Sequence, residues 1–186
     1  MANKDAPRGF TPVKTLSGAP VSQIIRYVGV TDAADMFRGD MLTLTSNLAA
    51  VSATNATAFL GIAVGFGKVD GDGIPLGPYN PDSLGTMYYD DSASTHTDWV
   101  VYYAPIDDLV FEGQTDADLD LAVGATCDLL ATAGSTTTGR SAHEFDANTN
   151  ADFTVHEIPK YPDNDNSLAN ARVWCIVTAG ETAFSG

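Results

Sequence analysis

Three histidines are the side chains best suited to acid-base or metal chemistry near neutral pH, and they lie far apart in the sequence. His96, His143 and His156 fall on different predicted elements, and none has a second histidine at the i, i+4 spacing of a helical zinc site. His143 and His156 are each followed by glutamate, but neighbouring residues of a strand project from opposite faces. The spacing therefore predicts no histidine metal site.

Two acidic runs, residues 116–120 and 163–167, begin like the calcium-binding loop of an EF-hand. Leu121 and Leu168 stand where that loop needs glycine for its turn, and neither run has glutamate at the twelfth position. An EF-hand is therefore excluded. Because clustered carboxylates bind hard cations readily, a weak and irregular Ca²⁺ site stays open as an alternative, but no metal or cofactor is predicted.

The familiar catalytic patterns are incomplete as well. There is no G-x-S-x-G nucleophile turn, and neither cysteine has a histidine close to it in the sequence. Residues 65–68 hint at a phosphate-binding loop, but Ile62 and Val69 replace its first glycine and its Ser or Thr. Paired carboxylates such as residues 107–108 are adjacent in sequence and do not converge. We predict no catalytic residues and no enzyme, and keep an acidic hydrolase with dispersed carboxylates as an alternative.

The two cysteines set no disulfide framework. Cys127 and Cys175 each lie in an apolar run, where a free cysteine behaves as a small buried hydrophobic residue. Their spacing matches no redox or zinc motif. We expect two buried thiols, with a disulfide between neighbouring strands as the alternative.

The charge composition limits the partners of the chain. Its 186 residues include 24 Asp and Glu against 9 Lys and Arg, for a net charge of −15. Nucleic acids and anionic membranes are bound by clustered Lys and Arg, so neither is a predicted partner. Residues 1–8 lack the apolar stretch of a signal peptide and no run reaches transmembrane length, which predicts a soluble protein made in the cytosol.

The charge is also unevenly distributed along the chain. Residues 1–38 hold five of the nine basic groups and only three acidic ones, so the remainder of the chain carries −17. The opening segment also contains Pro7, Pro12 and Pro20 and has no helical period. We therefore predict an extended N-terminal arm over residues 1–22 that rests on another surface.

The remaining residues, 23–186, are predicted to form a single all-β domain. Thr, Val, Ile and aromatic residues cluster in short runs between Gly, Pro, Asn and Asp. Strands are expected at residues 23–30, 40–45, 59–66, 97–103, 109–114, 126–131, 153–158 and 171–179. Residues 60–65 are apolar throughout, which favours a strand buried on both faces, and their glycines indicate close backbone approach or a bulge.

Two segments interrupt the strand pattern. Residues 31–37 are expected to form one capped helical turn or a loop. Residues 67–97 contain a dense run of Gly, Pro and Asp and are expected to form a long loop insert. The predicted fold class is thus a small β-barrel or β-sandwich-like domain, with an extended N-terminal arm and a Gly/Pro/Asp-rich loop insert.

Several runs of the sequence share their pattern with a known family. Residues 37–44 read Phe-Arg-Gly-Asp-Met-Leu-Thr-Leu, and after a polar hairpin residues 59–65 read Phe-Leu-Gly-Ile-Ala-Val-Gly. Together they resemble the opening of the small β-barrel in the capsid cement, or head decoration, proteins of tailed bacteriophages. Residues 168–175 resemble the start of the last strand in many phage head accessory proteins of this size. Residues 1–20 are similar to the N-terminal arms that such proteins lay across the capsid.

The resemblance implies a non-enzymatic structural protein of the virion. Such a protein is made in the host cytoplasm, assembles as a homotrimer on the outer surface of an icosahedral head, and clamps neighbouring subunits of the major capsid protein. The candidate capsid-interface residues lie on the arm and are Lys4, Arg8, Phe10, Pro12 and Lys14. An arm of mixed basic and apolar residues suits acidic or edge-strand surfaces, while the acidic body stays in solvent.

A carbohydrate-binding β-sandwich module is the alternative function. It is motivated by aromatic residues in the insert and the nearby strands, beside abundant Asp and Asn, with packing in the core as the competing explanation. These aromatic residues are Tyr79, Tyr88, Tyr89, Trp99, Tyr102 and Tyr103.

Overall fold

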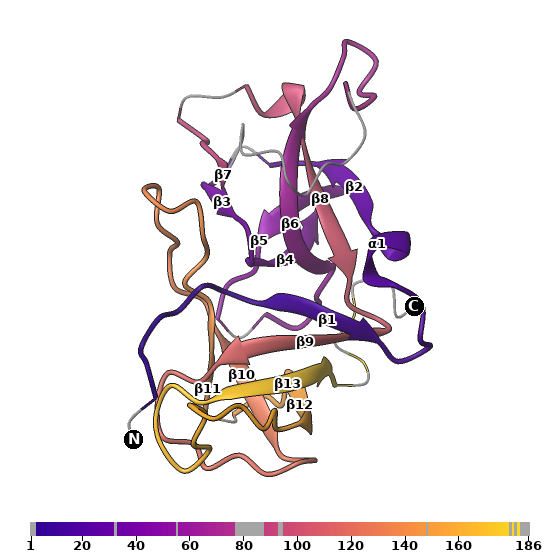
Figure 1. The fold of residues 1–186 in the computed structure, drawn as a ribbon. Helices are drawn as coiled ribbons and strands as arrows, with labels where there is room; N and C mark the ends of the chain where they lie inside the picture. The colour runs from indigo at the N-terminus through magenta and orange to yellow at the C-terminus, as the bar shows by residue number, and fades with distance from the viewer. Residues whose placement is uncertain are drawn as a thin grey trace.

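The chain is an all-β protein, as its sequence predicts. The computed structural model describes residues 3–31, 33–54, 56–76, 88–92, 95–147, 149–178, 180 and 182. This part of the chain forms an upper and a lower lobe, each built on one antiparallel sheet (Figure 1). Residues 77–87 of the predicted insert, which include Tyr79, lie outside the described residues.

The lower sheet has six strands in the order β1-β9-β13-β12-β10-β11. Their bounds are Thr11–Thr15 for β1, Leu109–Gln114 for β9, Arg172–Val177 for β13, Phe153–Glu157 for β12, Thr126–Leu130 for β10 and Glu144–Asp146 for β11. Strand β1 forms one edge of this sheet. It pairs along β9, with Thr11 opposite Glu112 and Thr15 opposite Leu109.

The upper sheet has five strands in the order β2-β8-β6-β4-β5. Their bounds are Arg26–Gly29 for β2, Trp99–Pro105 for β8, Gly61–Lys68 for β6, Met41–Thr45 for β4 and Leu48–Val51 for β5. A two-stranded sheet of β3 (Met36–Phe37) and β7 (Tyr88–Tyr89) lies beside it. The two helical turns are α1 (Val21–Ile24) and a 3-10 turn at His96–Asp98.

Both sheets curl, so that in the upper sheet the edge strands β2 and β5 approach each other, and in the lower sheet the edge strand β11 approaches β9, the neighbour of the other edge strand β1. In the upper sheet, a parallel bridge joins Val30, just after β2, to Ala49 in β5. In the lower sheet, a parallel bridge joins Thr115, just after β9, to Phe145 in β11. The described residues form no closed barrel, so each lobe is an open and strongly curved sheet.

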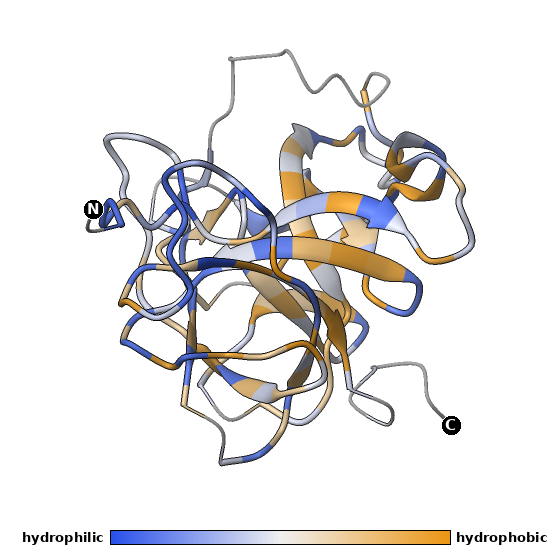
Figure 2. Cartoon of the chain, turned by 60° about the horizontal axis from the view of Figure 1, so that its bottom comes forward, coloured by the Kyte–Doolittle hydropathy of each residue, from blue (hydrophilic) through white to orange (hydrophobic). Residues whose placement is uncertain are grey.

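The main core lies between the two sheets and is rich in phenylalanine. The ring of Phe10, which directly precedes β1, packs against Phe111, Phe145 and Phe153 at centroid separations of 5.4, 4.9 and 6.0 Å. Met41 of the upper sheet contributes to the same cluster. Apolar residues follow the strands, while polar residues gather in the loops (Figure 2). Since burying one such side chain contributes about 1.5–3 kcal/mol, this cluster holds the lobes together.

Strand β6 is buried on both faces, as predicted. Ile62 faces the core between the sheets, whereas Ala63 faces a second core inside the curled upper sheet. The register with β8 shifts between Ala63 and Gly65, which marks a bulge. A Cβ at Gly61 would lie 2.3 Å from the carbonyl oxygen of Ala104, so only glycine fits there. Both explanations for the glycines of this strand are therefore confirmed.

The described part of the predicted arm lies along the protein's own lower sheet. Asn3 Nδ2 donates a hydrogen bond to the carbonyl of Asp165 at 2.8 Å, and Gln114 Nε2 donates to the carbonyl of Lys4 at 3.2 Å. Phe10 is 2% exposed and belongs to the core. Residues 3–15 are thus an integral part of the fold, and β1 completes the lower sheet.

Most predicted strands are found near their predicted bounds. Residues 40–45, 59–66, 97–103, 109–114, 126–131, 153–158 and 171–179 correspond to β4, β6, β8, β9, β10, β12 and β13. The predicted strand at 23–30 is wrong in its first half, because α1 occupies Val21–Ile24 and the strand begins only at Arg26. Gln23 N donates to the carbonyl of Pro20 at 3.0 Å, which closes the helical turn.

Other short strands have no counterpart in the prediction. These are β1, β3, β5, β7 and β11. Of the two alternatives for residues 31–37, the described part of the segment forms the loop and then ends in β3, and it forms no helical turn. Strands of two to five residues bury too few side chains for an alternating pattern to identify them.

Cys127 in β10 and Cys175 in β13 are buried free thiols, as predicted. Their Sγ atoms lie 3.9 Å apart. Strand β12 runs between β10 and β13, so the two backbones are separated by about 9–10 Å. A disulfide needs Cα atoms within about 7 Å, so the disulfide alternative does not fit this sheet order.

Candidate functional site

A groove of about 510 Å³ is lined by residues of both lobes, among them Thr11 and Pro12 of β1, and we call it the seam groove. Three arginines line it, Arg8, Arg38 and Arg140. The rest of its wall is largely apolar and consists of Phe10, Pro12, Val21, Ile25, Ala63 and Val64, with Thr11, Ser22 and Gly39. No acidic side chain is among the described residues that line it. The seam groove is therefore a basic and apolar concavity in a protein of net charge −15.

Backbone pairing brings Arg38 and Arg140 side by side. Arg38 N donates to the carbonyl of Gly139 at 3.3 Å, and Ser141 N donates to the carbonyl of Arg38 at 2.9 Å. Arg38 and Arg140 thus form a parallel bridge between the turn that precedes β4 and the loop that precedes β11. Both side chains are exposed.

The pairing of Arg38 with Arg140 is electrostatically unfavourable in the free protein. Like charges directly opposite each other in a sheet are destabilising. Within the described part of the chain, neither guanidinium forms an ion pair with a carboxylate. By contrast, Arg172 pairs with Asp163 at 2.5 Å. The two arginines therefore present uncompensated positive charge to the seam groove.

A tight turn holds Arg38 in place. Gly39 has φ of +94°, and a Cβ there would lie 2.7 Å from the carbonyl oxygen of Arg8. Gly39 N donates to the carbonyl of Ala63 at 2.9 Å, while Phe10 N donates to the carbonyl of Gly39 at 2.8 Å. This turn therefore ties the N-terminal segment to the middle of the upper sheet, and it requires glycine.

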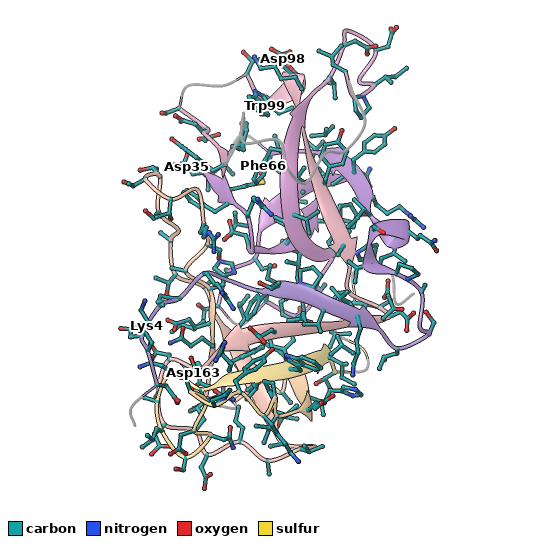
Figure 3. All side chains as sticks on the ribbon, in the orientation of Figure 1. Lys4, Asp35, Phe66, Asp98, Trp99 and Asp163 are labelled. Atoms are coloured by element: carbon teal, nitrogen blue, oxygen red, sulfur yellow. The ribbon has the colours of Figure 1, made fainter. Side chains whose placement is uncertain are left out.

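A smaller cavity of about 220 Å³ adjoins the seam groove, and we call it the N-terminal pocket. Its charged lining residues are Lys4, Arg8, Glu112, Asp163 and Arg172. Figure 3 shows Lys4 and Asp163 in the lower lobe, on the side of the N-terminus. Arg8 lines both cavities, so five of the nine basic residues of the chain surround this pair of cavities.

Glu112 of β9 organises the outer face of the lower sheet. Its carboxylate accepts hydrogen bonds from Tyr161 Oη at 2.8 Å and Trp174 Nε1 at 2.9 Å, and pairs with Arg8 Nη2 at 3.0 Å. Lys14 Nζ lies 5.0 Å from the ring centroid of Trp174. One buried carboxylate thus orients Arg8 and the aromatic side chain over which Lys14 lies.

A buried acid and imidazole lie beneath the Arg38 turn. Asp40 Oδ2 accepts a hydrogen bond from Phe37 N at 2.7 Å, and Met41 N donates to His143 Nδ1 at 3.1 Å. Because Nδ1 is an acceptor, the neutral imidazole carries its proton on Nε2, which lies 3.6 Å from Asp40 Oδ1. The contact joins the start of β4 to the loop before β11.

Burial keeps both partners neutral over a range of pH. It raises the pKa of Asp40 from 3.8 to about 7, although hydrogen bonds from Ser141 and Phe37 lower it in part. Burial also lowers the pKa of His143 from 6.5 to about 4. Between these values the contact is a neutral acid beside a neutral imidazole, so it is not an ion pair.

The structure separates the five predicted interface residues into three groups. Lys4, Arg8 and Lys14 are exposed, and Lys14 pairs with Glu157 at 3.2 Å. Pro12 is partly exposed and lines the seam groove. Phe10 is a core residue, so its ring is held by this protein's own phenylalanines and is not presented to a partner.

The histidines and acidic runs considered for metal binding do not converge on a common site within the described residues. No group of three or more His, Cys, Asp or Glu that could hold a metal ion occurs among the described residues. In the run 163–167, Asp163 pairs with Arg172, and Asp165 accepts hydrogen bonds from Ser167 N and Oγ. His143 lies in the core.

The aromatic residues that motivated a carbohydrate site are mainly packing residues. Tyr89, Tyr102 and Tyr103 are buried at 0%, 7% and 7% exposure. Tyr88 stacks on Phe37 with a centroid separation of 5.2 Å. Within the described part of the chain, these side chains form no exposed aromatic platform for a sugar ring.

Sequence reasoning missed Arg38 and Arg140 as a pair. The two residues are separated by about a hundred positions in the chain, and neither belongs to a motif for anion binding. Their proximity depends on the curl of the sheets. It also depends on backbone pairing between the loop that precedes β11 and the turn that precedes β4, which the sequence does not reveal. In the sequence only Arg140 stands out, because it is the first basic residue after the stretch 69–139, which contains no Lys or Arg.

The chain matches no protein-family model, no curated protein and no solved structure. None of the helices in the described residues is long and apolar enough to cross a membrane. Its function is therefore inferred from the residues and cavities of the molecule.

Proposed function

We propose that the protein is a capsid decoration protein, a non-enzymatic structural component of the virion. It binds the outer surface of an icosahedral phage head and stabilises contacts between subunits of the major capsid protein. The observation that supports this proposal is the gathering of basic residues around two adjoining cavities of a strongly acidic molecule. A molecule with this charge distribution favours one orientation on an acidic surface, because the complementary side is attracted and the acidic remainder is repelled.

In this proposal the side of the molecule formed by residues 3–15 together with Arg38 and Arg140, which we call the basic side, attaches to the shell. The acidic remainder of the molecule faces solvent. Lys4, Arg8 and Lys14 stand on or beside the lower sheet, where the hydrogen bonds of the fold already place their backbone. Such preorganisation reduces the entropy lost on association. The acidic remainder keeps decorated heads soluble and apart from one another, since like charges repel.

Attachment through one modest interface is strengthened when the protein assembles as a homotrimer. A homotrimer presents three copies of the basic side to the symmetric shell, so the second and third contacts form at high effective concentration. The binding free energy then comes from several repeated contacts, so tight attachment does not require a deep recognition pocket.

Cosedimentation with expanded capsids that lack the protein tests the proposal. The wild-type protein is expected to bind, and the variant Lys4→Glu/Lys14→Glu is expected to bind at least about fivefold more weakly, because both charge reversals lie on the N-terminal segment 3–15. The matched control is Lys68→Glu/Lys160→Glu, which makes the same change of charge at exposed residues that belong neither to that segment nor to the lining of either cavity.

Two results would contradict the proposal. The first is a wild-type protein that stays in the supernatant at every capsid concentration. The second is an equal loss of binding in the test and control variants, which would mean that net charge and not the basic side governs attachment. Thermal unfolding of each variant checks that the substitutions leave the fold intact.

A further inference from the structure

We propose that the seam groove binds an extended acidic peptide segment of the protein's partner, with carboxylates held by Arg8, Arg38 and Arg140. This inference rests on the proposed function, in which the partner is the major capsid protein. It specifies the chemistry of the capsid segment that is bound, and it names the residues of this protein that bind it. Of the seam groove and the N-terminal pocket, only the seam groove is lined by cations and by no carboxylate among the described residues.

The positive charge of Arg38 and Arg140 is uncompensated within the described residues and is already in place, whereas Arg8 pairs with Glu112. Arg38 and Arg140 are paired through their backbones, carry like charge and have no carboxylate partner within the described residues. Guanidinium groups bind carboxylates through two parallel hydrogen bonds. A ligand carboxylate placed between the two arginines would remove their repulsion and form charge-assisted hydrogen bonds to both.

The apolar wall favours a peptide over a small anion. Pro12, Val21, Ile25 and Val64 line the same groove, and its volume is about 510 Å³. A single inorganic anion would fill a small part of this space and leave the wall in contact with water. A peptide in which acidic and apolar residues alternate would satisfy both the arginines and the wall, since alternate side chains of an extended chain point in opposite directions.

The groove also runs beside a free sheet edge. Strand β1 has β9 as its neighbour on one side and no described strand on the other. Thr11 and Pro12 of β1 line the groove. An extended segment lying there can add to this edge through backbone hydrogen bonds, to which Pro12 contributes only its carbonyl because it has no N–H.

Fluorescence anisotropy on the full-length protein tests the inference. The probes are a labelled peptide of alternating Glu and Leu and a matched peptide in which Gln replaces every Glu. The acidic peptide is expected to bind at least about tenfold more tightly, because only carboxylates form charge-assisted hydrogen bonds with the arginines. Equal binding of the two peptides would overturn the inference.

Substitutions at the paired arginines locate the site. Arg38→Gln and Arg140→Gln are each expected to weaken binding of the acidic peptide about tenfold. Arg38→Lys is expected to give an intermediate loss, because lysine keeps the charge but not the two-pronged geometry. The control Lys160→Gln removes an exposed cation outside the groove and is expected to leave binding unchanged. Unchanged binding in both arginine variants would refute the assignment.

The same variants distinguish this inference from the proposed function. If Arg38→Gln/Arg140→Gln binds capsids as well as wild type does, the groove inference fails while the decoration function stands. If wild type binds the acidic peptide but never capsids, the function fails and the groove assignment stands. Self-association of wild type that disappears in the arginine variants would identify a second copy of this chain as the occupant, which contradicts the inference.

Discussion

The paired arginines Arg38 and Arg140 impose a cost on the free protein. Their like charges are brought together by a backbone bridge and have no counter-charge among the described residues. Replacing Arg140 by glutamine is expected to raise the free energy of unfolding by about 0.2–1 kcal/mol, because the repulsion is removed. Urea denaturation measures the change.

The same Arg140→Gln protein should bind the acidic probe more weakly although it is more stable. Such opposite effects on stability and binding are typical of residues retained for function. A variant that is less stable than wild type would show that Arg140 contributes to the fold in a way that the backbone bridge does not explain.

The Asp40 and His143 pair gives stability two opposing dependences on pH. Asp40 has its pKa raised from 3.8 to about 7, so the folded state binds its proton more tightly and stability falls as pH rises through this range. His143 has its pKa lowered from 6.5 to about 4, so the folded state releases its proton and stability falls as pH drops through that range. Between about pH 4 and 6.5 the two effects offset each other.

Single substitutions are expected to separate these two effects. Relative to wild type, Asp40→Asn removes the carboxyl effect, so its stability should rise more, or fall less, between pH 4 and 6.5, by up to about 3 kcal/mol. His143→Gln removes the histidine effect, so its stability should fall more steeply than that of wild type over the same range. Chemical denaturation of the three proteins at a series of pH values measures both differences, because other groups such as Glu144 titrate equally in all of them. Differences from wild type of the same sign in the two variants would contradict this description of the pair.

At the scale of elements, the Arg38 turn connects the N-terminal segment to the upper sheet. Gly39→Ala combines a strained positive φ with a clash against the carbonyl of Arg8, and we expect it to cost roughly 2 kcal/mol or more. Gly124→Ala is the matched control, since Gly124 has φ of +85° but no atom within 4 Å of its added Cβ. The melting temperature should fall further for Gly39→Ala than for Gly124→Ala. Equal losses would mean that backbone strain alone, without the contact, accounts for the effect.

Long apolar or alternating segments were predictable, whereas short paired segments were not. The continuous apolar run 60–65 identified β6 because a strand buried on both faces needs apolar residues at every position. Strand β1 escaped notice because it is an edge strand that contains Pro12 and Lys14, so its alternation is interrupted. The compositional features of an extended arm, proline and mixed charge, are also those of an edge strand, and sequence alone does not tell them apart.

The candidate site was predictable only in its N-terminal half. Lys4, Arg8 and Pro12 were expected at an interface because of local composition, and they line the two cavities. The position of Phe10 in the core, and the arrival of Arg140 beside Arg38, depend on long-range packing of the two lobes. Removing residues 1–20 to test the arm would therefore also remove Phe10 and β1 and so destabilise the protein, which makes charge reversal at Lys4 and Lys14 the better experiment.

At the scale of the whole molecule, the proposed decoration function requires an assembly that matches the symmetry of the shell. Multi-angle light scattering on the purified protein is expected to give a mass three times that of the 19.5 kDa chain. Three copies each carrying −15 repel one another, so the trimer should be favoured by added salt, which screens that repulsion. A monomer at every salt and protein concentration would refute a trimer that forms before docking.

The orientation of the protein on the capsid tests the central claim most directly. Image reconstruction of capsids decorated with the wild-type protein should place the side bearing Lys4, Arg8, Arg38 and Arg140 against the shell. The far end of the upper lobe, where Figure 3 shows Asp98 and Trp99, should then point into solvent. Density in which that end meets the shell, or capsids that acquire no density at all, would contradict attachment through the basic side.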